Sequence, residues 1–477
     1  MRAYEGARQE LNEHLSTTTV WYKLEPNVLV PPQPLQILCR GFIEGSAQMY
    51  DVDWDQYLPG AGRVGSSSHD DLLNTLTRVD FVSVVALVLS FLAIVLGFDA
   101  ICGEREQGTL RLVLSHSVSR AQIVAAKLLG GFLSVWIPMA LAFVSCLLVI
   151  QANPDVDLSA DDWLRLVCLF ALTCLFLAQV YAVAVLVSAY TRRASTSLII
   201  CLFGWLVLGS GYSSALPSIA RYTIDWPPWE EFVEQENGAW SRYSERKSEW
   251  EKQHPAPSEA HMQGLWKDNI IHYLPPAGQA WFELRVAWEF DAVMDRADEI
   301  RRFRMANQMP LAHQQFFVDR WAILSPFASY RALSKWLVRS TLEDNFVVSE
   351  YGVQYRQTYL DFVRGRAATV GWRRWITDDP PATPPMIADP DAATADDLQE
   401  GSLFLQQANA AAEARWERDK DHRSSLDLTG LPQVGDGWRR SFSESLARML
   451  PGILVLVLTL GAAVMLTLRR FSRYQLS

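Results

Sequence analysis

Five long apolar runs constrain this chain more than any other feature of its sequence. Each run is free of Asp, Glu, Lys, Arg and His and approaches the ~20 residues that an α-helix needs to cross the hydrocarbon of a bilayer. Helices on the surface of a soluble protein would show a polar face, which these runs lack. The sequence therefore predicts five transmembrane helices, at residues 81–98, 128–150, 166–187, 197–214 and 449–468.

The composition shows that the membrane part is only a fraction of the protein. The 477 residues are 49% hydrophobic and 20% charged, which is too polar for a pure membrane bundle. The formal net charge of −10 argues against nucleic acid as a partner. The six cysteines have no spacing typical of zinc or of a disulfide framework. We expect an all-α polytopic membrane protein that carries a large water-exposed domain.

Lysine and arginine placement predicts the orientation of the five helices. Basic residues concentrate in the loop after the first run, after the third run and in the C-terminal tail, which are therefore predicted to be cytoplasmic. The loop after the second run is rich in Asp and is predicted to lie outside. The expected domains are an extracytoplasmic segment (1–78), four membrane helices (79–214), a mainly helical extracytoplasmic domain (215–445), and a last membrane helix with a cytoplasmic tail (446–477).

This topology starts outside the membrane without an apparent signal. Residues 1–14 are polar and contain no apolar stretch that could direct translocation. The simplest expectation is that a sixth, N-terminal membrane helix is missing from the given sequence.

The membrane runs contain few polar groups. Ion-coupled carriers and pumps usually need ionisable residues near the middle of the membrane, so their absence favours an external energy source. We expect Thr173 and Gln179 in the third run to form hydrogen bonds between helices. The chain has no G-x-x-x-x-G-K-[ST] motif for nucleotide phosphates and no hydrolase signature, so neither an ATPase nor an intramembrane enzyme is supported.

The cytoplasmic loop at residues 99–127 has its own helical pattern. Leu110, Val113 and Leu114 recur at helical spacing, and Thr109 is placed to cap this short helix. Ser119 and Gln122 then have the spacing of a capping box that begins the second membrane helix. The sequence predicts a short amphipathic helix, a turn, and then a membrane helix.

This loop also carries a family resemblance. The sequence DAICGEREQGTLRLVLS (residues 99–115), followed by VSR and KLLG, resembles the signature of ABC exporter permeases of the type 2 class, in the branch related to copper-enzyme-maturation permeases. The sequence LSPFASY (residues 324–330) is similar to a subgroup with a large, uncharacterised outer domain. The resemblance implies an exporter subunit in a plasma membrane, usually with six membrane helices. It also implies a separate ATPase subunit that docks on this loop, and a second permease copy or paralogue.

The resemblance gives the loop residues provisional roles. Glu104 and Glu106 are expected to pair with basic residues of the ATPase, and Arg105 and Arg111 with acidic residues or lipid phosphates. Gly108 would permit a tight turn. Leu110, Val113 and Leu114 would seat the helix, and Thr109 would cap it. The alternative is a membrane-anchored envelope scaffold or signal relay, whose outer domain binds another protein. A neighbouring gene for an ATPase would separate the two readings.

The sequence predicts that the outer domain is mainly helical and rich in aromatic residues. Helices are expected at residues 229–252, 279–309, 311–337 and 398–418, and a proline-rich linker at 378–397. His254, His261 and His272 lack Cys or Met partners, so we expect no metal site and no cofactor. The tryptophans at 226 and 229 suggest an aromatic belt at the membrane surface.

Overall fold

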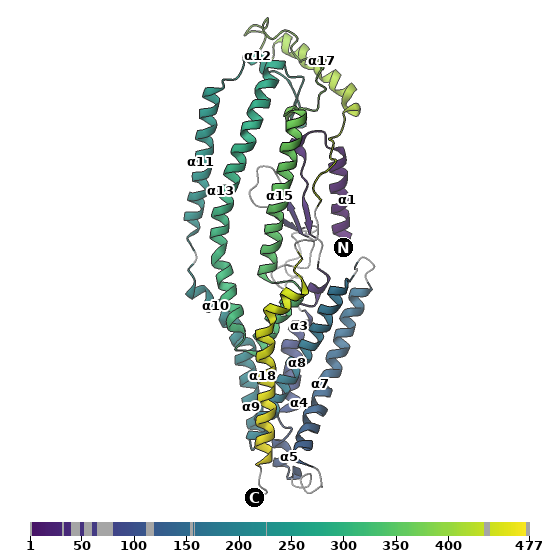
Figure 1. Ribbon diagram of the computed structural model, residues 1–477, viewed down its shortest axis with the longest axis vertical. Helices are drawn as coiled ribbons and strands as arrows, with labels where there is room; N and C mark the ends of the chain where they lie inside the picture. The colour runs from purple at the N-terminus through teal and green to yellow at the C-terminus, as the bar shows by residue number, and fades with distance from the viewer. Residues whose placement is uncertain are drawn as a thin grey trace.

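The computed structural model describes residues 2–30, 33–39, 48–51, 60–63, 80–110, 119–152, 156, 158–225, 227–433 and 439–473. The molecule is elongated, with a bundle of apolar helices at one end and a second set of long helices at the other (Figure 1). We call these two parts the membrane bundle and the helical domain. The chain passes from the bundle into the helical domain through α10 (Tyr212–Thr223) and returns through α18 (Phe442–Ser472).

Among the described residues, five helical segments of the membrane bundle are long and apolar enough to cross a bilayer, which confirms the predicted number. Each is longer than the apolar run that predicts it, because polar residues extend the helices beyond the apolar core. These segments are Phe81–Glu106 (α3, η3, α4 and α5), Arg120–Gln151 (α7), Ala160–Tyr190 (α8), Ala194–Thr223 (α9, η4 and α10) and Phe442–Ser472 (α18).

Helix α8 is the centre of the bundle. It packs against α4 (Ser90–Gly97), α7 and α18, and more than half of its apolar window is buried. Thr173 and Gln179 bond to neighbouring helices, as predicted: Gln179 donates to the hydroxyl of Thr459 on α18, and the Thr173 and Tyr330 hydroxyls lie 3.0 Å apart. Many apolar side chains on the outside of the bundle are exposed, as expected for helices that face lipid.

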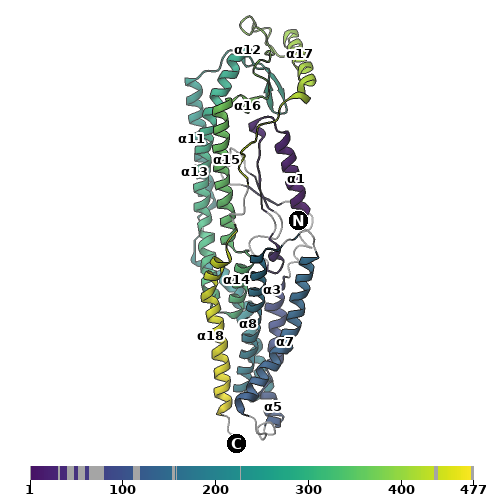
Figure 2. The ribbon, with the colours of Figure 1, turned by 45° about the vertical axis from the view of Figure 1, so that its right-hand side comes forward.

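The helical domain is built on three long helices that run side by side, α11 (Trp229–Gln253), α13 (Pro276–Ala322) and α15 (Leu342–Val370) (Figures 1 and 2). Shorter elements cover one side and the far end of these helices. They are α1 (Arg2–Thr17), η1 (Trp21–Lys23), α12 (Glu259–Met262), α16 (Arg373–Ile376), α17 (Leu403–Asp419) and η5 (Lys420–His422). The turn η2 (Pro34–Ile37) packs instead on the membrane bundle, where Leu35 joins the apolar core.

Strands are few and short. Strands β1 (Val28–Val30), β2 (Gln48–Asp51) and β3 (Gly60–Arg63) form an antiparallel sheet in the order β1-β2-β3. Strands β4 (Leu265–Lys267) and β5 (Ile270–His272) form a hairpin. Asp268 and Asn269 connect β4 and β5 with φ values of 51° and 61°, a left-handed turn that suits Asp and Asn.

The helices of this domain differ from the prediction at one proline. The sequence predicts a break at Pro310, but α13 continues through it for 47 residues. The break lies instead at Ser325, whose hydroxyl accepts from the amide of Ala328 and caps α14 (Pro326–Leu337). Pro326 occupies the first turn of α14, where a missing amide hydrogen costs little. Residues 378–397 have no helix or strand, yet Met386 and Ile387 are buried against the β4–β5 hairpin side of the domain.

Helix α14 packs inside the membrane bundle, although it belongs to the range that the sequence assigns to the outer domain. It lies against α8 and α18 (Figure 2). Its Tyr330 ring stacks on Phe176 of α8, with 4.4 Å between the ring centroids. At the turn before it, Ser325 donates to the carbonyl of Leu208, in the second half of the fourth apolar run. The end of α13 and the whole of α14 therefore form a hairpin that enters the bundle, and we call residues 312–337 the re-entrant hairpin.

Candidate functional site

The site predicted from the sequence lies at the end of the membrane bundle farthest from the helical domain. There the chain turns from α4 into the short helix α5 (Cys102–Glu106). The hydroxyl of Ser188 on α8 accepts from the amides of Ile101 and Cys102, each at 3.0 Å. Ile101 and Cys102 are fully buried, so the corner is fixed to α8 by both packing and hydrogen bonds.

The charged residues of α5 bond within the chain. Glu104 forms an ion pair with Lys127 of α7 at 2.6 Å. Arg105 donates to the carbonyl of Thr191 at 2.9 Å, and Glu106 accepts from the amide of Ala194 at the start of α9 at 3.0 Å. In this structure these three side chains therefore tie the corner to α7, α8 and α9, whereas the sequence reading gives them roles toward a partner.

Within the described part of the loop, residues 106–109 are exposed, as are residues 119–122. We call residues 106–109 the tip. Gly108 has a φ of 76°, in the left-handed region that glycine adopts without strain, and it makes the turn expected of it. The hydroxyl of Thr109 donates back to the carbonyl of Glu104, and Leu110 is buried. Arg111, Val113 and Leu114 lie outside the described residues.

The loop ends on the predicted capping box. Ser119 accepts from the amide of Gln122, and the Gln122 side chain bonds the amide of Ser119 in return, so α7 begins at Arg120. Arg120 also donates to the carbonyl of Ser472 at the end of α18. About two turns further along α7, the carbonyl of Lys127 accepts from the hydroxyl of Tyr181 on α8 at 3.1 Å. Both ends of the loop are thus held by the bundle.

A second cluster of polar side chains lies far away, in the helical domain. The ligand-type atoms of His272, Asp378 and Asp379 lie within 4.8 Å of one another, and all three side chains are buried. Sequence reasoning considered His272 but missed its acidic partners, which belong to the predicted linker. The guanidinium of Arg423 contacts Asp378, and lies 3.0 Å from both Asp379 and the His272 ring.

Arg423 therefore places a positive charge directly beside this cluster. Burial lowers the pKa of the Arg423 guanidinium and raises the pKa of the adjacent Tyr273 hydroxyl. The Arg423 guanidinium offsets carboxylate charge where a metal ion would have to bind, so this cluster fits a structural tie between residues 378–379 and 423 better than a metal centre.

Comparison with known proteins decides the family. Residues 35–475 match the family described as "ABC-2 family transporter protein", which covers most of the chain. The chain belongs to the ABC-2 transporter family. The match makes it a membrane permease subunit rather than an enzyme, as the sequence predicts.

A curated relative supports the same class. Over 142 residues the ABC-2 permease is 32% identical to the "Probable ABC transporter permease protein NosY" of Pseudomonas aeruginosa. The aligned part is 29% of this chain and 50% of that protein, so the chain spans about half the length of the curated relative it matches.

Proposed function

We propose that this ABC-2 permease is an exporter subunit in the plasma membrane, energised by a separate ATPase that docks on the loop after the first membrane helix. The observation that carries the proposal is the exposed tip at residues 106–109, mounted on a corner that is bonded to three membrane helices. A partner that binds this tip contacts a rigid junction, so its movement reaches several helices at once.

The bonds of the corner define the path of that movement. Lys127 holds both Glu104 and the carbonyl of Ala100, and Ser188 holds the amides of Ile101 and Cys102. A push on the tip would therefore move α4 and the first turns of α7 together. In this proposal the charged residues of α5 hold the corner to the neighbouring helices. The tip residues Gln107 and Thr109 are then the better candidates for direct contact with the ATPase.

We also propose on which side of the membrane the helical domain lies and how the permease assembles. The helical domain lies at the end of the molecule opposite the loop, so an ATPase in the cytoplasm would place this domain outside (Figure 1). Helix α7 exposes a long apolar face whose members include Leu129, Leu133, Ile137 and Leu141. Such a face suits lipid or a second permease copy, and we propose that two permeases form the pathway.

The docking proposal is tested by placing a bulky side chain on the tip. Gln107 is exposed, and its side chain forms no hydrogen bond within the described part of the chain. Gln107→Trp should therefore leave the fold intact and block a close approach of the ATPase. We expect co-purification of the ATPase from native membranes in mild detergent to fall several-fold, together with loss of stimulated ATP hydrolysis.

The matched control is Gln253→Trp, an exposed glutamine at the C-terminal end of α11 in the helical domain. This variant should retain the ATPase. Equal recovery of the ATPase with both variants would argue against docking at the tip, and an envelope protein in place of an ATPase would favour the scaffold alternative.

A further inference from the structure

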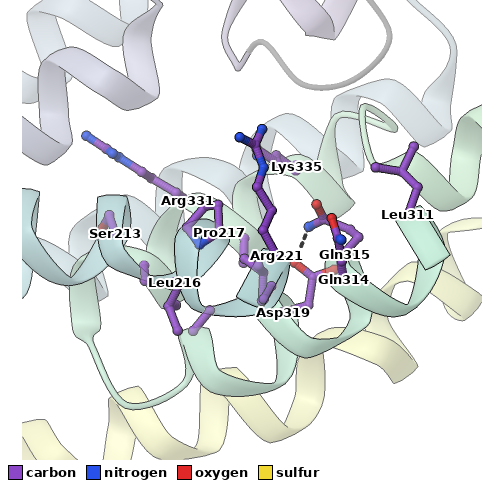
Figure 3. A pocket seen from close by; sticks show the side chains of 15 residues that line it. Ser213, Leu216, Pro217, Arg221, Leu311, Gln314, Gln315, Asp319, Arg331 and Lys335 are labelled. Carbon is purple, nitrogen blue, oxygen red and sulfur yellow. Dashed lines mark hydrogen bonds between the residues drawn. The ribbon is translucent and has the colours of Figure 1, made fainter. Parts of the chain in front are cut away.

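A pocket of about 350 Å³ lies where α10 meets the re-entrant hairpin (Figure 3). Its walls come from α10 and from the consecutive helices α13 and α14, which are distant from α10 in sequence. Part of the lining is apolar, from residues such as Leu216, Pro217, Ala220 and Val318. The loop that we propose for ATPase docking is at the opposite end of the bundle, so the pocket belongs to a different site.

The charged lining of this pocket is unbalanced. It contains three cations, Arg221, Arg331 and Lys335, and a single carboxylate, Asp319. Asp319 accepts a hydrogen bond from Gln315 at 2.8 Å, drawn as a dashed line in Figure 3. Within the described part of the chain, no carboxylate lies within ion-pair distance of the three cations. The pocket therefore carries an excess of two positive charges.

Two buried polar atoms in the lining also lack partners. The Nε atom of Arg331 and the hydroxyl oxygen of Ser213 are shielded from solvent and form no hydrogen bond among the described residues. A buried polar group without a partner costs about 1–3 kcal/mol. Both groups can donate a hydrogen bond, so together with the cations they fit a ligand that presents anionic oxygens.

The depth of the cations narrows the class of ligand. The turn before α14 contacts Leu208, which lies within the fourth apolar run, in its second half. The last carbonyl of α14 accepts from Arg165, which directly precedes the third apolar run. Arg331 and Lys335 lie on α14 between these two levels. Ionisable side chains at membrane depth that face a cavity are a mark of ligand sites.

We propose that this pocket binds the phosphate headgroup of an anionic membrane lipid. Arg331 and Lys335 contact the phosphate oxygens, Arg221 completes the positive rim, and an acyl chain lies along the apolar wall of α10 and α13. Arginine is well suited to this task because its guanidinium donates two parallel hydrogen bonds to a phosphate. The inference does not depend on the proposed direction of transport or on ATPase docking.

The test measures lipid binding to the full chain, purified in an uncharged maltoside detergent, by isothermal titration calorimetry. The probes are short-chain phosphatidylglycerol, phosphatidylcholine with the same chains, and glycerol 3-phosphate. We expect phosphatidylglycerol to bind more tightly than either of the others. The double variant Arg331→Gln/Lys335→Gln should weaken its binding by about tenfold or more, because two charge-assisted contacts are lost.

The control is Arg320→Gln, an exposed arginine on the same hairpin that does not line this pocket. Its affinity for phosphatidylglycerol should stay within about twofold of the original. A second variant, Ala332→Phe, fills the pocket without removing a cation and should cause a similar loss. Equal binding of the two lipids would overturn the proposal, as would tight binding of glycerol 3-phosphate or an unchanged affinity in either pocket variant.

Discussion

At the scale of single residues, the contact between α7 and α8 depends on a glycine. A Cβ atom on Gly131 would lie 1.8 Å from the Tyr181 hydroxyl oxygen, whereas a Cβ on the adjacent Gly130 would meet nothing within 4 Å. Tyr181 also bonds the carbonyl of Lys127, so it cannot move away without losing that hydrogen bond. Of these two neighbouring glycines, Gly130 has space for a side chain and Gly131 does not.

We therefore predict that Gly131→Ala destabilises the membrane bundle by about 1–3 kcal/mol, through overpacking against Tyr181. Gly130→Ala should be neutral or stabilising by up to about 1 kcal/mol, because alanine favours the helix. Thermal unfolding of the two variants in detergent would measure the difference. Equal midpoints for both variants would contradict the close packing of α7 on α8.

At the scale of elements, α11 and α13 are joined by a ladder of polar and aromatic contacts. The Arg296 guanidinium lies 3.8 Å from the centroid of the Trp240 ring and 4.7 Å from that of Tyr243. The Tyr243 hydroxyl donates to Glu289 at 2.8 Å, and burial raises the pKa of that hydroxyl. Arg296 is itself buried, so its cation–π contacts are shielded from water.

We predict that Arg296→Ala lowers the free energy of unfolding of the helical domain by about 1–2 kcal/mol. Arg302→Ala on the same helix, where the side chain is exposed and donates to the carbonyl of Asp298 within the helix, should change it by less than about 0.5 kcal/mol. Chemical denaturation of the single variants, with Trp240→Ala added to complete a double-mutant cycle, would isolate the ring contact. A coupling near zero between residues 240 and 296 would contradict it.

The elements also show what the sequence could and could not predict. Run length and local spacing set the five membrane helices and the capping box at Ser119, so both were predictable. The break at Pro310 was wrong because packing in a long helix can compensate for one missing hydrogen bond. Helix α14 is short and amphipathic, and only contacts with distant residues such as Phe176 place it in the bundle.

Contacts between residues that are distant in sequence were also unpredictable at the loop site. The position of the loop and the turn at Gly108 follow from local sequence, and both were predictable. The partners of Glu106 and Arg105 are backbone groups at residues 194 and 191, more than eighty positions away. No local pattern in a single sequence reveals such partners. The sequence alone therefore suggested that these charged residues contact another protein.

At the scale of the whole molecule, the membrane bundle and the helical domain meet at a buried arginine. Arg165 is fully buried and pairs with Asp161 at 2.6 Å. It also donates to the carbonyls of Leu337 and Arg440 and to the hydroxyl of Ser445. One side chain of α8 thus joins the end of α14 to the start of α18.

We predict that Arg165→Met destabilises the junction by about 3–5 kcal/mol, because the carbonyls and Asp161 lose a buried charged partner. Arg448→Met, which removes an exposed ion pair to Glu343, should cost no more than about 1 kcal/mol. Limited proteolysis near residues 338–341 and 439–441 would report loosening of the junction. Identical digestion of the two variants would contradict the role of Arg165.

The length of α13 has a mechanical consequence. At 1.5 Å per residue its 47 residues extend about 70 Å, from a hairpin set among the membrane helices to the far end of the molecule. A continuous helix bends little, so α13 can act as a lever that pivots at the re-entrant hairpin, where α14 packs against α8 and α18. A tilt of about 5° at the hairpin would swing the far end by about 6 Å over that length. Small movements among the membrane helices would thus become large displacements at the far end of the helical domain.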